Sequence, residues 1–355
     1  MKILILKFRN IGDVLLVTPL LDNLKAHYPD ALIDIAVNKG TEAMVEGHPA
    51  LHSVITYNRV FIKSLGIWNR LKAELAFAWK LRTTHYDIVI NLTEGDRGAQ
   101  LALISNAPIR VGYHSKNRLF HRAFTHFLPL QKMRHTLECN LDPLLSLGLP
   151  ILTHKATIAW SEKDANTTKE YMNFIHIHPV SRWLFKCIDD ALMAQIIDFC
   201  QKELHTPVIL TASSDEMELK KIEKILSFCK TSPTNLGGSL SLKETAALNA
   251  KAKMFIGVDT AIMHISAAND VPVLAFFGPS GAFHWGPWDN ALSQSEYTQK
   301  NGFQRMGKHR VLQVDWQCSP CGKDGCNGSK ISDCLMQKGL DIETIKHHIK
   351  EMLHD

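Results

Sequence analysis

The segment Phe255–Ser280 combines acidic, hydroxyl and glycine residues in a pattern that suits a phosphorylated ligand. An apolar run ends at Gly257, and Asp259 and Thr260 then open a helix-like segment. A second apolar run ends in Gly278, Pro279 and Ser280. This order predicts a βαβ unit, and parallel sheets bind ligands beyond the carboxyl ends of their strands, where these residues would lie. Since backbone N–H groups at glycine turns and helix starts attract phosphate, the segment indicates a nucleotide-type ligand.

A candidate catalytic carboxylate follows the first apolar run, Lys2–Lys7. Asp13 comes directly after Gly12 and precedes apolar residues at helical spacing, so we expect it at the carboxyl end of the first strand. A carboxylate there could take a proton from a substrate hydroxyl. The alternative is that Asp13 only caps the helix, since Asp is a preferred N-cap residue. The loop has a single glycine and no G-x-G-x-x-G fingerprint, so the phosphate-binding evidence stays with the second half of the chain.

Two cations in the second half could neutralise a diphosphate. Arg182 and Lys186 are four residues apart, so on a helical turn they would share one face. The alternative is an exposed basic turn. His264 comes one turn after Thr260 and could reach the same site or pack inside.

Two further residues suit a nucleoside. Asp215 follows an apolar run that ends at Thr211, a position where carboxylates often accept hydrogen bonds from ribose hydroxyls, although Asp215 could equally cap a helix. Leu240 follows a glycine pair and could pack on an adenine ring.

Four of the eight cysteines form the pattern C-x2-C-x4-C-x7-C at Cys318, Cys321, Cys326 and Cys334. This spacing is compatible with a small tetrahedral metal site. A structural zinc ion and free thiols in a compact loop are the two interpretations. Because the pattern lies near the C-terminus, we interpret it as scaffold and not as chemistry.

The elements that must position these residues alternate between strand and helix, which predicts a doubly wound α/β fold. At 355 residues the chain exceeds one ordinary core, so we expect two such domains. The expected strands are Lys2–Lys7, Leu32–Val37, Ser53–Tyr57, Ile88–Leu92, Ile109–Gly112, Ala156–Trp160, Asn173–His178, Val208–Thr211, Met254–Val258, Val273–Phe277 and Val311–Val314. The expected helices include Val14–His27, Ile67–Arg82, Asp189–Leu204, Asp215–Cys229, Leu242–Lys251, Thr260–Ala268 and Asp341–Leu353.

Composition and charge narrow the class of protein. With 45% apolar and 21% charged residues and no apolar run near the roughly 20 residues that span a bilayer, we expect a cytoplasmic globular protein. Residues 97–137 hold seven Lys/Arg, four His and no acid, which would attract polyanions or simply form a solvated face. No aromatic-basic recognition motif accompanies this charge, so a nucleic-acid partner is not expected. The aromatic-basic helix at residues 67–82 suits a membrane surface or packed core, and we expect core.

Three stretches of the chain resemble the glycosyltransferase family 9 heptosyltransferases. They are KILILKFRNIGDVLLVTP at the start, SRWLFKC in the middle, and GVDTAIMHISAA followed by FFGPS. FKC and WGPW are most similar to the lipopolysaccharide core heptosyltransferase III type. The resemblance implies a GT-B fold, with two Rossmann-like doubly wound domains facing a central cleft. Residues 1–155 would bind the acceptor, residues 156–338 the nucleotide sugar, and residues 339–355 would form a helix that packs back on the first domain.

The resemblance also implies the chemistry. Heptose would pass with inversion from ADP-L-glycero-D-manno-heptose to a heptose of the phosphorylated lipopolysaccharide inner core, with peripheral contact to the inner membrane. No cofactor would be required, and the absence of a D-x-D motif agrees with a metal-independent reaction. The implied roles are general base for Asp13, phosphate contacts for Lys186 and Arg182, ribose contact for Asp215, adenine contact for Leu240, and donor binding for Asp259, Thr260 and His264. A nucleotide-sugar epimerase or hydrolase and a non-catalytic nucleotide- or polyanion-binding protein remain the alternatives.

Overall fold

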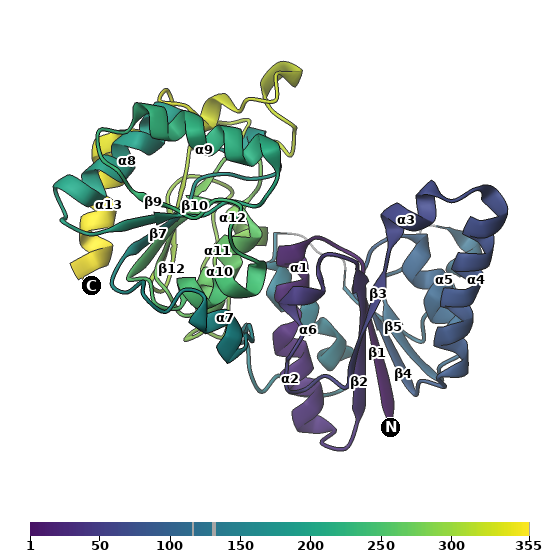
Figure 1. Ribbon diagram of the computed structural model, residues 1–355. Helices are drawn as coiled ribbons and strands as arrows, with labels where there is room; N and C mark the ends of the chain where they lie inside the picture. The colour runs from purple at the N-terminus through teal and green to yellow at the C-terminus, as the bar shows by residue number, and fades with distance from the viewer. Residues whose placement is uncertain (116, 130–132, 355) are drawn as a thin grey trace. The chain divides into compact units, whose positions relative to one another are not determined.

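The computed structural model describes residues 1–115, 117–129 and 133–354, which form two compact units (Figure 1). The first unit comprises Met1–Lys132 and Thr136–Ala159, and the second comprises Met133–His135 and Trp160–Asp355. In each unit helices cover both faces of one sheet. The predicted doubly wound α/β class is therefore confirmed. The chain passes from the first unit to the second after residue 159, whereas the sequence placed this boundary at residue 155.

The sheet of the first unit has the strand order β3-β2-β1-β4-β5-β6, and all neighbouring pairs are parallel. Its central strand is fully buried from Ile3 to Leu6, as expected where helices cover both faces. The strands are β1 (Lys2–Lys7), β2 (Leu32–Asn38), β3 (Ser53–Tyr57), β4 (Ile88–Asn91), β5 (Ile109–Gly112) and β6 (His126–Phe127).

The helices of the first unit follow the predicted order with one interruption. The helix expected after Asp13, at Val14–His27, is divided in two at Leu16 and Val17, and Pro19 lies in the first turn of the second piece, where its missing N–H costs no hydrogen bond. The elements are α1 (Ile11–Leu15), α2 (Thr18–His27), η1 (Glu42–Met44), α3 (Arg59–Ser64), α4 (Ile67–Thr83), α5 (Asp96–Ser105), η2 (Arg118–Phe120) and α6 (Thr136–Ser146).

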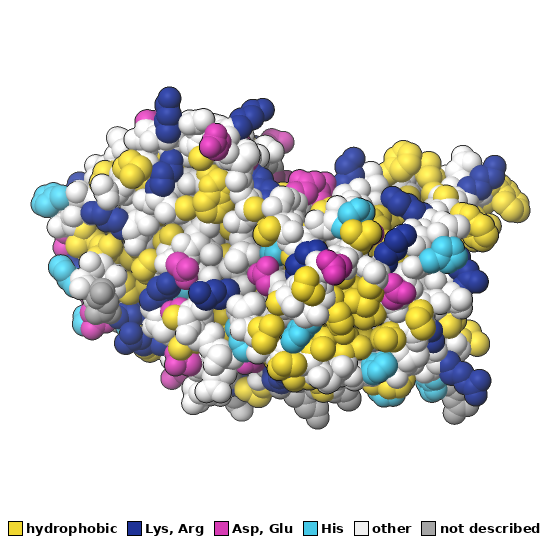
Figure 2. All heavy atoms as spheres, turned by 90° about the horizontal axis from the view of Figure 1, so that it is seen from below, with side chains coloured by type: hydrophobic (Ala, Val, Ile, Leu, Met, Phe, Trp, Pro, Cys, Tyr) yellow, Lys and Arg dark blue, Asp and Glu magenta, His cyan; other side chains and the backbone are white. Residues whose placement is uncertain are grey.

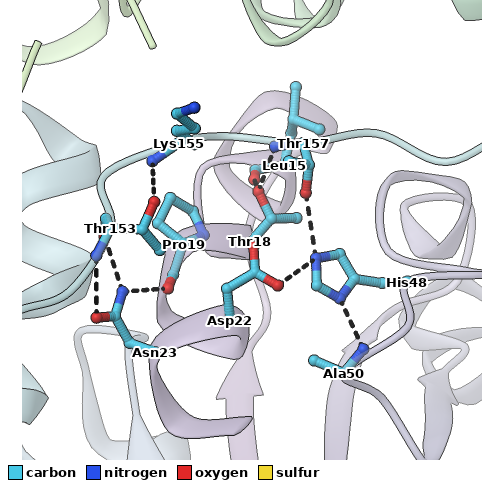
Figure 3. Close-up of polar contacts among 10 residues, drawn as sticks. All are labelled: Leu15, Thr18, Pro19, Asp22, Asn23, His48, Ala50, Thr153, Lys155 and Thr157. Atoms are coloured by element: carbon cyan, nitrogen blue, oxygen red, sulfur yellow. Dashed lines mark hydrogen bonds and ion pairs between the residues drawn. The ribbon is translucent and has the colours of Figure 1, made fainter. Parts of the chain in front are cut away.

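The strand expected at Ala156–Trp160 is absent from the described chain, so that prediction is wrong. The segment that contains it runs along α2, and side chains supply its hydrogen bonds (Figure 3). Asn23 Oδ1 accepts from Leu152 N–H at 2.6 Å, and Thr18 Oγ1 accepts from Thr157 N–H at 3.0 Å. These polar groups hold an extended segment that no neighbouring strand pairs with.

The second sheet has the order β12-β13-β11-β10-β7-β8-β9, parallel except for the edge strand β12. Its strands are β7 (Ile175–His178), β8 (Val208–Leu210), β9 (Thr234–Asn235), β10 (Met254–Val258), β11 (Val273–Phe277), β12 (Gln304–Met306) and β13 (His309–Gln313). Its helices are α7 (Glu162–Asn166), η3 (Leu184–Lys186), α8 (Asp190–Lys202), α9 (Glu216–Phe228), α10 (Leu242–Asn249), α11 (Ala261–Ala268), α12 (Ala282–Trp285), η4 (Cys326–Gly328), η5 (Asp333–Leu335) and α13 (Ile342–His354).

The C-terminal helix α13 belongs to the second unit. Ile345, Ile349 and Met352 are buried in the core that α8 and the second sheet share. An apolar stripe at this spacing covers whichever surface lies beneath it. The expectation that residues 339–355 pack back on the first domain is therefore wrong.

Helix α4 departs from its predicted environment. Its aromatic and aliphatic stripe was expected in the core, but Trp68 is 75% exposed and Trp79 is 69% exposed. Only Ala78 and Leu81 of this helix are buried. In the part of the chain that the structure describes, no helix combines the length and apolarity needed to cross a membrane.

Candidate active site

Each sheet changes its direction of winding once, between β1 and β4 in the first unit and between β7 and β10 in the second. In doubly wound folds ligands bind outside the carboxyl ends of the strands at this point. Asp13 follows β1, Lys186 follows β7, and Asp259 follows β10. The residues given the main chemical roles therefore lie at the two switch points.

Asp13 is buried, with 8% of its surface exposed, in the third position of α1. The N-cap residue of this helix is Asn10, so the alternative prediction that Asp13 is the N-cap is wrong. Its Oδ2 nevertheless accepts a hydrogen bond from Asn10 N–H at 3.3 Å. The loop after β1 is fixed to the loop after β4, because Phe8 N–H donates to Thr93 Oγ1 at 2.8 Å. The carboxylate is thus held by the local backbone, and a capping contact and a chemical role are compatible.

Lys7 is a buried cation beside Asp13 that sequence reasoning did not assign to the site. Its Nζ donates to Asn140 Oδ1 at 2.9 Å, and Asn140 Nδ2 donates to Leu16 O. Burial lowers the pKa of Lys7 to about 8, and the charge of Asp13 opposes that shift. A lysine that ends an otherwise apolar strand was the signal that could have identified it.

The second switch point carries a carboxylate held by two donors. Asp259 Oδ2 accepts from Lys186 Nζ at 2.6 Å and from Ser280 Oγ at 2.5 Å. Burial alone would raise the pKa of Asp259, but the Lys186 charge and the hydrogen bonds from Lys186 and Ser280 hold it below its ordinary value. Three of the predicted site residues are therefore brought together by direct contact.

Two predicted residues at the start of α11 lie next to this cluster. Thr260 is the N-cap of the helix, and its Oγ1 is buried with no hydrogen-bond partner in the described chain. His264 is buried one turn later, and the charge of its ring would lower the pKa of Asp259 further. Because a buried hydroxyl normally finds a partner, Thr260 indicates a polar ligand at this point.

Gly278 and Pro279 form the turn after β11 and are fixed by contacts with later parts of the chain. A Cβ at Gly278 would lie 2.6 Å from Leu335 Cδ1, so glycine is needed for close packing here. The Gly278 carbonyl accepts from Gln313 Nε2 at 2.8 Å, and the Pro279 carbonyl accepts from Gly322 N–H at 2.8 Å. These bonds tie the turn to the C-terminal loop. The role of its N–H groups toward phosphate stays a prediction.

Arg182 and Lys186 do not share a helical face. The helical turn between them is η3, which starts only at Leu184, with Trp183 before it outside the helical region at φ -97° and ψ 88°. Arg182 is exposed, with its guanidinium carbon 5.7 Å from the centre of the Trp183 ring. The helical-turn expectation is wrong, and Arg182 matches the alternative of an exposed basic turn.

Two acidic residues after β8 have different environments, since Asp215 caps a helix and Glu218 is buried. Asp215 is exposed and caps α9, since its Oδ1 accepts from Met217 N–H at 2.9 Å. Glu218, which sequence reasoning did not single out, is 5% exposed and accepts from Ser213 N–H at 2.9 Å. The capping alternative for Asp215 is realised, and its ribose contact stays a prediction.

Leu240 is half-buried at the end of the loop after β9. It packs beside the small core cluster of Phe174, Ile209 and Leu248. Because the side chain is partly open to solvent, an adenine ring could pack on it, and this contact stays a prediction.

The rings of His176 and His178 are buried and have hydrogen-bond partners within the fold. The rings share the Thr211 hydroxyl, at 2.8 Å from His176 Nε2 and 2.9 Å from His178 Nδ1. Burial lowers the pKa of His176 to about 3 and that of His178 to about 4, and it lowers the pKa of His135 to about 3. All three rings are therefore neutral at physiological pH.

These rings make stability depend on pH. In the unfolded chain they protonate near pH 6.5, whereas in the folded chain they stay neutral to about pH 4 or below, so their stabilisation is complete above pH 6.5 and is lost on acidification. We expect the free energy of unfolding to fall by about 1.4 kcal/mol per pH unit for each ring below that point. Burial raises the pKa of Asp22 to about 6, so the folded chain binds one proton there before the unfolded chain does. This proton stabilises the fold on acidification and offsets the loss from one ring. The urea midpoint, followed by circular dichroism, should be lower at pH 5.5 than at pH 7.5.

A matched pair of variants isolates the buried rings in that measurement. His178→Asn should reduce the pH dependence, whereas His205→Asn, at an exposed position with a φ of 47° that Asn tolerates, should leave it unchanged. Equal dependence in both variants would contradict the assignment.

The four C-terminal cysteines differ in exposure. Cys318 and Cys321 are exposed and Cys334 is buried, and burial together with the neighbouring cysteines raises the pKa of Cys334 to about 12. Within residues 1–115, 117–129 and 133–354, no group of three or more His, Cys, Asp or Glu is arranged to hold a metal ion. The structural zinc ion stays a prediction beside the alternative of free thiols.

Two cations of the basic segment at residues 97–137 have partners within the described chain. Arg97 pairs with Glu74 at 3.1 Å, and the Arg110 guanidinium donates to the carbonyls of Ala107 and Ala123. Arg122 is exposed, whereas Lys116 and Lys132 lie outside the described residues.

The sequence is similar to proteins of one known family. The sequence profile of glycosyltransferase family 9 (heptosyltransferase) matches residues 75–311. Lipopolysaccharide heptosyltransferase 3 of Escherichia coli is 30% identical over 80% of this chain and 85% of the relative. The lipopolysaccharide core heptosyltransferase OpsX of Haemophilus influenzae is 23% identical over 90% of this chain and 91% of the relative.

Solved structures show the same fold over nearly the whole chain. The glycosyl transferase family 9 protein of Veillonella parvula superposes with a TM-score of 0.80 at 21% identity, covering 99% of this chain and 97% of that one. The ADP-heptose lipopolysaccharide heptosyltransferase II of E. coli superposes with a TM-score of 0.72 at 19% identity, covering 100% and 99%. This likeness confirms the predicted GT-B fold.

Proposed function

We propose that this chain, which belongs to glycosyltransferase family 9, the heptosyltransferase family, transfers heptose from ADP-L-glycero-D-manno-heptose to a heptose of the lipopolysaccharide inner core, with inversion. The family makes it a glycosyltransferase, and the similarity to lipopolysaccharide heptosyltransferase 3 supports this class of acceptor. The observation that carries the donor assignment is the contact of Lys186 and Ser280 with Asp259 at the second switch point.

The donor diphosphate would bind at Lys186. A lysine ammonium has three donors, and one is directed to Asp259, which leaves donors for phosphate oxygens. The ion pair holds Nζ in place, so little order has to be gained when the donor binds. The Thr260 hydroxyl, which has no hydrogen-bond partner within the described chain, is a further donor at the start of α11, next to Asp259. As the bond between the anomeric carbon and the phosphate oxygen breaks, the leaving ADP gains negative charge that Lys186 stabilises.

Asp13 would act as the general base. The acceptor hydroxyl oxygen attacks the anomeric carbon as ADP leaves, and its proton passes to the Asp13 carboxylate. Attack opposite to the leaving group produces inversion.

The proposal is tested by incubating the protein with ADP-heptose and a panel of truncated core acceptors, with mass spectrometry of the products. We expect addition of one heptose to an acceptor that ends in heptose, and NMR of the product should show the inverted anomeric configuration. Release of free heptose without an acceptor would favour a hydrolase. Tight ADP binding without transfer to any acceptor would favour a binding protein.

A further inference from the structure

Helices α3 and α4 of the first unit carry an exposed apolar surface. On α4, Trp68, Leu71, Leu75 and Trp79 are each at least half exposed, and at this spacing they lie on one face of the helix. On α3, Val60 is 82% exposed. Figure 2 shows hydrophobic side chains beside Lys and Arg at the right-hand edge, the side on which α3 and α4 lie in Figure 1.

The opposite face of α4 is firmly attached to the unit. The Phe77 ring packs edge-on against Tyr57 with centroids 5.2 Å apart, and Tyr57 OH donates to Glu74 Oε1 at 2.6 Å. Arg97 donates to the other Glu74 oxygen at 3.1 Å. Because the inward face already has its own aromatic and polar partners, the outward stripe is a second apolar face and not a displaced core face.

The charge around this surface has one sign. Six Lys/Arg lie in residues 58–84 against a single acid, Glu74, which is bound by Tyr57 and Arg97. All six are exposed: Arg59, Lys63, Arg70, Lys72, Lys80 and Arg82. The outward surface thus presents tryptophan and leucine among cations.

We propose that the α3–α4 surface binds the face of an anionic phospholipid bilayer, with α4 lying along it. Tryptophan and leucine on a helix rich in Lys and Arg insert at the level of lipid headgroups, and the cations are attracted to anionic phosphates. A protein partner would have to match dense positive charge around an aromatic stripe, whereas an anionic bilayer supplies both requirements at once. The inference concerns where the first unit binds and does not depend on the acceptor proposed above.

Sedimentation with vesicles tests this inference. Full-length protein should bind vesicles of phosphatidylglycerol and phosphatidylethanolamine, bind phosphatidylcholine vesicles far more weakly, and dissociate as salt is raised. Trp68→Ser/Trp79→Ser should lower the partition coefficient at least about tenfold, and Lys72→Gln/Lys80→Gln/Arg82→Gln should reduce it on anionic vesicles alone. Met217→Ser/Phe228→Ser, which removes two exposed apolar side chains from α9, is the matched control and should bind like the native protein.

Two results would overturn the inference. The first is that the native protein ignores anionic vesicles, or that the tryptophan variant binds them equally well. The second is concentration-dependent self-association, by analytical ultracentrifugation, that is lost in the tryptophan variant, since the face would then be an interface between copies. The tryptophan variant should keep native turnover on a soluble core oligosaccharide that carries no lipid. If the native protein has no turnover but binds vesicles, the proposed function fails and this inference stands.

Discussion

Asp13→Asn is expected to lower kcat by about 10²–10⁴-fold while the Kd for ADP stays unchanged. The amide has nearly the shape of the carboxylate, and its oxygen can still accept the hydrogen bond that Asn10 N–H now donates to Asp13 Oδ2. It cannot take up a proton at neutral pH. The substitution therefore removes the base and keeps the local helix contact. Initial rates with ADP-heptose and a heptose-terminated acceptor, together with calorimetric ADP titration, give the two quantities.

Asp13→Ala separates the chemical role from the structural one. It removes both the base and the hydrogen bond, so it should be as inactive as Asp13→Asn and unfold at a lower temperature. If Asp13→Asn turned over at the native rate and only Asp13→Ala were impaired, the carboxylate would serve α1 alone and the base would have to be sought elsewhere.

The strands were the most predictable part of the fold. β1, β3, β5, β10 and β11 have the bounds that the sequence predicted, because each is a short, mainly apolar run next to a charged, polar or glycine residue. Parallel strands covered on both faces need such runs, so composition alone marks them. The segment at residues 156–160 has similar residues but takes its hydrogen bonds from α2 side chains, a tertiary contact that local pattern does not encode.

The surroundings of amphipathic helices were not predictable in the same way. The stripes of α4 and α13 have helical spacing, which fixes their secondary structure but not what covers them. We expected α4 in the core and α13 on the first domain, and both expectations were wrong. A stripe has the same period whether a sheet, another helix or a lipid surface lies against it.

The site was predictable where two residues follow neighbouring strands, because both the strand ends and the sheet topology fix their positions. Asp259 and Ser280 each follow a neighbouring strand of one sheet, so topology brings them together, and their 2.5 Å contact agrees. Lys7 and Glu218 escaped notice because their burial depends on packing from distant segments, such as Asn140 for Lys7. Charged side chains of this kind become visible only when the fold supplies their partners.

Lys186→Met is expected to lower kcat by about 10²–10³-fold, since it removes the cation that stabilises the leaving diphosphate. The single variant is ambiguous, because it also leaves the buried Asp259 carboxylate without its charged partner and should destabilise the fold. Lys186→Met/Asp259→Asn resolves this. The amide oxygen can still accept from Ser280 Oγ, so no unpaired charge remains buried and thermal stability should return toward the native value.

Turnover of the double variant decides the role of Lys186. If the lysine contacts the diphosphate, kcat stays low although stability recovers. If it only pairs with Asp259, kcat recovers together with stability, and Lys186 leaves the donor site. The control is Lys221→Met/Asp190→Asn, because that pair has nearly the same exposure, 20% and 9% against 23% and 8% for Lys186 and Asp259. It joins α8 to α9 and has no role in the proposed reaction, so its loss should leave kcat unchanged and show that removing a half-buried ion pair does not by itself stop transfer.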